Sequence, residues 1–92
     1  MNLLEIVSHL NTLDEDATIY ASSPWQVSSE AVVDLEPEEG GLPVDAKLRG
    51  LDYFLEVYIA KEFLDGWIGS QKDVPSLKDQ CIRLIEYATN DA

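Results

Sequence analysis

The stretch DATIYASSPWQVSSEAVVDLE, residues 16–36, decides the fold class because it contains two strand patterns close together in the chain. Residues 17–21 are rich in β-forming side chains and run into a Ser-Ser-Pro turn that ends the pattern. Residues 30–36 alternate between two faces, which is the period of a half-buried strand. Because strands this close in sequence pair most readily with each other, we predict an antiparallel hairpin.

The next apolar stretch, LDYFLEVYIAKEFLDGWI at residues 51–68, fits both a strand and a helix. Its aromatic and β-branched residues favour a strand over 53–59, followed by a helix over 60–68. Between the hairpin and this stretch we expect an acidic, mobile loop over about 36–44. Pro43 and Gly50 then stand where a short helix would start and stop.

Two further helices are predicted from apolar spacing and from capping residues. Asn2 can cap a helix over 3–11, and Ser76 begins a capping-box-like pattern ahead of a helix over 77–89. The predicted fold is therefore α+β, with one domain over residues 1–92. In it, a small antiparallel three-stranded sheet packs with helices on one face, in the order α-β-β-β-α-α.

The charge of the chain is strongly negative and unevenly distributed. Among 92 residues there are 18 acidic and 6 basic side chains, a net charge of −12. Residues 1–46 hold ten of the acids and no lysine or arginine. This excess argues against binding to nucleic acid or to anionic membranes, because both require clustered cations. It favours a basic protein partner, or it keeps the protein dissolved.

Cysteine usage and the first residues bear on the compartment. The single cysteine, Cys81, cannot form an intramolecular disulfide, and the chain does not begin with the basic segment of a secretion signal. We therefore expect a reducing, cytoplasmic location.

We find no motif for catalysis, for a cofactor or for a metal. The chain has neither a Gly-rich phosphate-binding loop nor a G-x-S-x-G turn, and its only histidine is His9. Cys81 falls on the apolar stripe of the last helix and is expected to be buried. Glu56 lies within an apolar run, and it becomes a site candidate only if it is buried with a partner such as Lys61. We expect no enzyme activity, no cofactor and no metal site.

The candidate protein-binding residues are acidic and aromatic. The acidic run at the end of the second strand supplies Asp34, Glu36, Glu38 and Glu39. Trp25, in the hairpin connection, can be an exposed anchor for a partner or can fold back over an edge of the core. Beside Tyr20 and the acidic strand, Trp25 would complete a patch suited to a partner rich in arginine or lysine.

Two segments of the chain carry a family pattern. The first consists of DATIYA at 16–21, PW at 24–25 and SEAVV at 29–33; the second consists of YFLEV at 53–57, IA at 59–60, EFL at 62–64 and Trp67. Together they resemble a family of small, acidic, uncharacterised bacterial proteins, a domain of unknown function. Because that family has no established activity, the resemblance implies no functional residue.

These observations favour a non-catalytic, acidic protein-binding module of the bacterial cytoplasm. Its size and composition are similar to those of immunity proteins and antitoxins, so it could cover the nucleic-acid-binding face of a basic toxin. The alternative is a structural or regulatory subunit that forms a homodimer through apolar surface around residues 53–67. A small enzyme or metal binder is a third hypothesis, which no motif supports.

Overall fold

The computed structural model describes residues 1–90, which form a three-stranded antiparallel sheet and four α-helices. This confirms the predicted α+β class and the order α-β-β-β-α-α of the principal elements, and a short helix stands between the last two strands. The elements are α1 (Leu3–Ser8), a 3-10 turn (Leu10–Thr12), β1 (Thr18–Ala21), β2 (Ala31–Asp34), α2 (Val44–Leu48), β3 (Asp52–Glu56), α3 (Val57–Gly69) and α4 (Leu77–Asn90).

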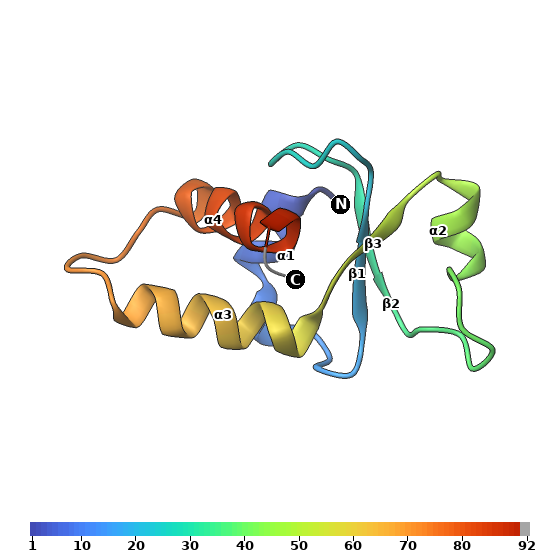
Figure 1. Ribbon diagram of the computed structural model, residues 1–92, viewed down its shortest axis with the longest axis horizontal. Coiled ribbons are helices and arrows are strands. Elements are labelled where there is room, and N and C mark those ends of the chain that lie inside the picture. The colour runs from blue at the N-terminus through green and yellow to red at the C-terminus, as the bar shows by residue number, and fades with distance from the viewer. Residues whose placement is uncertain (91–92) are drawn as a thin grey trace.

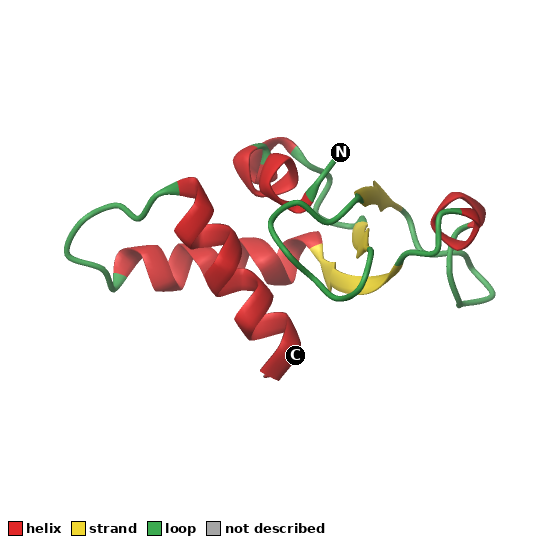
Figure 2. Ribbon diagram, turned by 90° about the horizontal axis from the view of Figure 1, so that it is seen from above, coloured by secondary structure: helices red, strands yellow, loops and turns green. Residues whose placement is uncertain are grey.

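The sheet has the order β2-β1-β3, so β1 is the central strand and pairs with both neighbours. Its inner face packs against α1, α3 and α4, as Figures 1 and 2 show. The core on this side is apolar and closely packed; Ile6 of α1, Ile19 of β1 and Leu55 of β3 are completely buried. This core gives the domain its main hydrophobic stabilisation.

The outer face of the sheet has a second, smaller core, which no sequence pattern predicted. Tyr20 alternates with Ile19 along β1, so its ring lies on the outer face, where it packs with Ala46 of α2 and with Leu51. The expectation of helices on one face is therefore wrong, because α2 covers the opposite face (Figure 2). A large ring on the central strand needs such a cover, since its exposure would cost hydrophobic free energy.

The boundary between β3 and α3 also differs from the prediction. The expected strand over 53–59 ends at Glu56, and α3 begins at Val57. The pairing of β1 with β3 contains an irregularity between Ile19 and Tyr20, and it brings both Phe54 and Leu55 to the inner core. Strict alternation would have placed those two side chains on opposite faces.

The expected capping hydrogen bonds are present at the N-termini of α1 and α4. The Asn2 side chain accepts a hydrogen bond from the Glu5 backbone N–H at 2.8 Å, and the Glu5 carboxylate accepts one from the Asn2 backbone N–H. Ser76 accepts a hydrogen bond from the Asp79 backbone N–H at 3.1 Å ahead of α4. Within residues 1–90, no helix is both long enough and apolar enough to cross a membrane.

Candidate functional site

Carboxylates and tyrosines lie together on the outer face of the sheet, near the N-terminal end of β1. Thr18 lies opposite Asp34 of β2 on one side and opposite Glu56 of β3 on the other. Side chains at directly opposed positions share a face, so both carboxylates flank the buried Thr18. Tyr53 is opposed to Tyr20 in the same register and is half-exposed.

Burial and nearby carboxylates raise the pKa values of the two tyrosines. Burial raises the pKa of Tyr20, and the carboxylates of Glu36, Asp34 and Glu56 raise it further. Partial burial likewise raises the pKa of Tyr53, with further contributions from Glu56 and Glu36. Each carboxylate disfavours a phenolate because like charges repel. Asp34, Glu36 and Glu56 therefore all raise the pKa of Tyr20, although they come from two strands and a loop.

A second group of acids lines a neighbouring cleft of about 450 Å³. The cleft lies between the segment before β1 and the first turns of α3; its lining is Asn11, Glu15, Asp16, Tyr58, Lys61, Glu62 and Asp65. Tyr58 is half-exposed in the cleft and follows Glu56 by two residues across the β3–α3 boundary. The two groups of acids therefore adjoin at this boundary.

Lys61 is the one cation among the described residues that line this cleft, and it is already bonded. Its side chain is 14% exposed. The Nζ atom donates to the Leu13 carbonyl oxygen at 3.2 Å and lies 3.6 Å from a Glu15 carboxylate oxygen. One ammonium group therefore offsets only part of the negative charge around it, and the other carboxylates remain available to a partner.

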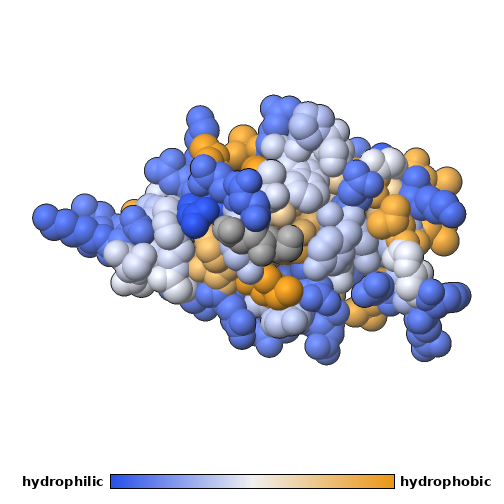
Figure 3. All heavy atoms as spheres, viewed as in Figure 1, coloured by the Kyte–Doolittle hydropathy of each residue, from blue (hydrophilic) through white to orange (hydrophobic). Residues whose placement is uncertain are grey.

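We use the name acidic face for this surface. It comprises Glu15, Asp16, Asp34, Glu36, Tyr53, Glu56, Tyr58, Glu62 and Asp65, and we include in it the exposed acids Glu38 and Glu39 of the loop that follows Glu36. Figure 3 shows hydrophilic side chains along the lower edge of the molecule and at the lower right, where the loop between β2 and α2 lies. Three stretches of the chain contribute to it: the turn before β1, β2 with the loop that follows it, and the continuous segment of β3 and α3.

The predicted acidic residues lie on this surface, but Trp25 does not. Asp34 is opposed to Thr18 at one end of the hairpin, whereas Ala21 is opposed to Ala31 at the end that bears Trp25. Trp25 folds back over the core. Its ring packs edge-on against Phe54 with 4.9 Å between the ring centroids, and its Nε1–H donates a hydrogen bond to the Ala21 carbonyl oxygen at 3.3 Å. The expected patch of Trp25, Tyr20 and the acidic strand is therefore not formed.

Sequence reasoning missed the aromatic part of the acidic face and the acids of the cleft. Tyr53 and Tyr58 supply the exposed rings in place of Trp25 and the buried Tyr20. Glu56 is half-buried at the end of β3, and Lys61, named as a partner it would need if buried, bonds instead to Leu13 and Glu15. The sequence signal that could have indicated these exposed tyrosines is the run from 53 to 58, in which polar and aromatic residues interrupt the apolar pattern.

The other reactive side chains do not form a catalytic arrangement. His9 is exposed at the end of α1, where its Nδ1 lies 2.9 Å from the Glu5 carbonyl oxygen. Cys81 is buried as expected, and burial raises the pKa of its thiol to about 11, so it stays protonated at neutral pH. Among the described residues, no group of three or more His, Cys, Asp or Glu side chains could hold a metal ion.

Comparison of the chain with protein-family models, with curated proteins and with solved structures gives no match. The resemblance to the acidic bacterial family therefore stays a prediction. The function must be argued from the charge and geometry of the acidic face.

Proposed function

We propose that the chain is a non-catalytic module that binds a basic protein through the acidic face. The observation that carries this proposal is that carboxylates from three stretches of the chain lie near Tyr53 and Tyr58, while Lys61 is bonded to Leu13 and Glu15. Carboxylates held together on one surface without matching cations repel each other. A partner that brings arginine or lysine relieves this repulsion, so the arrangement favours binding.

The chemistry of the surface suits arginine in particular. Carboxylates accept paired hydrogen bonds from a guanidinium group, and a tyrosine ring can receive the same group on its face. Tyr53 and Tyr58 are 46% and 45% exposed, so both rings are accessible beside acids. Negative potential over the surface would steer a basic partner during encounter, and close pairs at the centre would slow dissociation.

In its most concrete form, the proposed module is an immunity protein or inhibitor of the bacterial cytoplasm. A toxin that acts on nucleic acid exposes a cationic face for phosphates, and a rigid acidic surface can compete for that face. The sheet supports this role because Asp34 and Glu56 are fixed on strands on either side of Thr18. Preorganised carboxylates lose less conformational entropy on binding than those on a free chain.

The proposal can be tested by affinity capture with charge-matched variants. Glu36→Gln, Glu38→Gln and Glu39→Gln together remove three negative charges from the acidic face. As control, Asp52→Asn, Asp73→Asn and Asp79→Asn remove three charges from elsewhere. We expect the native chain and the control to retain the same basic protein from a bacterial lysate, and the acidic-face variant to lose it. Equal retention by both variants would contradict the proposal.

The alternative, a homodimer through residues 53–67, has less geometric support. The large apolar side chains of this segment are mostly in the core: Phe54, Leu55, Val57 and Leu64 are at most 3% exposed. The most exposed rings of the segment, Tyr53 and Tyr58, lie beside carboxylates, whereas Phe63 and Trp67 are partly buried. Two copies meeting there would bring like charges together.

A further inference from the structure

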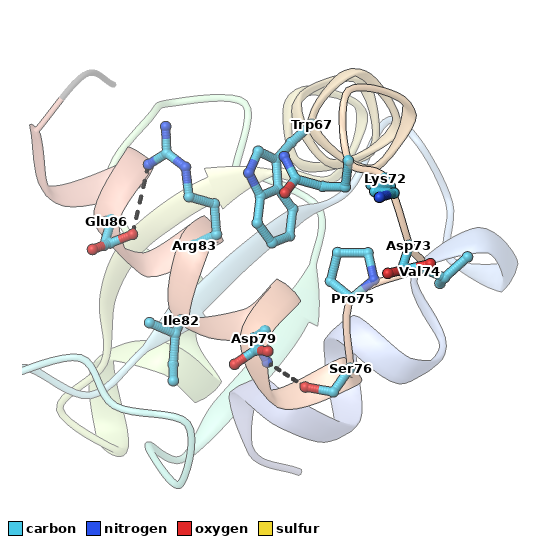
Figure 4. Close-up of a pocket in the computed structure, with 11 residues that line it drawn as sticks. Trp67, Lys72, Asp73, Val74, Pro75, Ser76, Asp79, Ile82, Arg83 and Glu86 are labelled. Carbon is cyan, nitrogen blue, oxygen red and sulfur yellow. Dashed lines mark hydrogen bonds and ion pairs between the residues drawn. The ribbon is translucent and has the colours of Figure 1, made fainter.

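The outer side of α4 has a ridge, the row of Lys78, Ile82 and Glu86, with a hollow on each side. Ile82 is 41% exposed and lines both hollows. One hollow, of about 280 Å³, separates α4 from Trp25 and Val27 of the loop between β1 and β2. The other, of about 580 Å³, lies between α4, Trp67 of α3 and the α3–α4 connection, as Figure 4 shows.

This surface differs from the rest of the molecule in its charge. The charged residues that line the two hollows are three cations and three carboxylates: Lys72, Lys78, Arg83, Asp73, Asp79 and Glu86. They sum to zero, whereas the whole chain has a net charge of −12. Two copies of the chain can therefore approach each other here without the repulsion that opposes contact between their acidic faces.

The ridge itself is complementary to its own reversed copy. Lys78, Ile82 and Glu86 follow one another at i, i+4 and i+8, so they lie in one row along α4. A two-fold axis through Ile82 would place Lys78 of each copy opposite Glu86 of the other. It would also bring the two Ile82 side chains into contact at the axis.

We infer that the ridge of Lys78, Ile82 and Glu86 is the interface of a two-fold symmetric homodimer, with the α4 helices antiparallel. The occupant of this surface is thus a second copy of the chain. This surface is separate from the acidic face, so the dimer would present two acidic faces to partners. The inference does not depend on the proposed function.

Charge exchange tests this pairing directly. The single variants Lys78→Glu and Glu86→Lys each place like charges opposite each other at both symmetry-related contacts. We expect each to weaken dimerisation by about tenfold, measured by sedimentation equilibrium. The double variant Lys78→Glu with Glu86→Lys restores opposite charges and should return the dimerisation constant to near the native value. Lys47→Glu on α2 changes the net charge by the same amount as Lys78→Glu and should have little effect.

A cross-link gives an independent measurement. Ile82→Cys places one thiol of each copy at the two-fold axis, where oxidation should form a disulfide-linked dimer. The native Cys81 is buried and should not interfere, and Leu48→Cys on the exposed side of α2 is the control. A native chain that stays monomeric up to about 1 mM would overturn the inference. So would a double charge exchange that fails to restore association, or equal cross-linking through position 48.

Discussion

Trp25 illustrates, at the scale of a single residue, how an aromatic side chain in a polar loop can serve the core. Its ring packs edge-on against Phe54, and its indole N–H donates to the Ala21 carbonyl oxygen. Both contacts hold the loop between β1 and β2 against the inner core. The side chain therefore has a structural explanation.

Trp25→Ala should lower the free energy of unfolding by about 2–3 kcal/mol, because it removes a half-buried ring and its hydrogen bond. Trp25→Phe keeps the ring contact with Phe54 and should cost less than half of that. Urea unfolding followed by circular dichroism measures both values. If Trp25→Ala left stability unchanged, the proposed packing role of Trp25 would be wrong.

The buried thiol of Cys81 should make stability sensitive to alkaline pH. Burial raises its pKa from 9.0 to about 11, so the folded state holds the thiol proton more tightly than the unfolded state. This contribution to stability is complete below the unfolded pKa and is lost as the pH rises between the two values. Cys81→Ala should flatten the fall in unfolding free energy over that range; an unchanged slope would contradict the assignment.

At the scale of elements, Glu56 stands at the junction of β3 and α3 and also belongs to the acidic face. Glu56 ends β3 and is the N-cap residue of α3, yet its side chain forms no capping hydrogen bond. Its backbone is extended, with ψ of 145°, which suits a capping residue. The position therefore carries a side chain that is too long to cap well and that lies beside Tyr53 on the acidic face.

Glu56→Asp should raise the free energy of unfolding by about 0.5–1 kcal/mol, since the shorter carboxylate can accept hydrogen bonds from the first turn of α3. Glu56→Gln keeps the length and supplies no cap, so it measures separately the effect of removing one charge from the acidic face. Thermal unfolding of the three proteins side by side distinguishes the cases. A loss of stability on Glu56→Asp would show that the longer glutamate side chain contributes packing that outweighs the gain from a cap.

Local patterns predicted most of the elements and missed features that depend on tertiary contacts. The hairpin, the helix over 77–89 and the short helix before Gly50 follow from spacing and caps. The end of β3 could not be predicted, because a strand irregularity set by pairing with β1 brings Phe54 and Leu55 to the same face. The acidic cleft was missed because it joins segments that are distant in sequence.

At the scale of the whole molecule, negative charge is concentrated on one surface and nearly balanced on another. The acidic face should destabilise the folded chain through self-repulsion, which salt screens. We predict that the free energy of unfolding rises by about 1 kcal/mol between about 0.05 M and 0.5 M NaCl. The variant with Gln at 36, 38 and 39 should show a smaller rise than the control with Asn at 52, 73 and 79. Equal salt dependence would mean that the repulsion is not localised.

The most direct measurement is affinity capture by the native chain at two salt concentrations, with the retained proteins identified by mass spectrometry. The Debye length falls from about 14 Å at 0.05 M salt to about 4 Å at 0.5 M, so binding through the acidic face should weaken steeply. We predict a specific basic protein that is retained at low salt and released at high salt. A partner retained equally at both concentrations, or one with an acidic surface, would contradict binding through the acidic face.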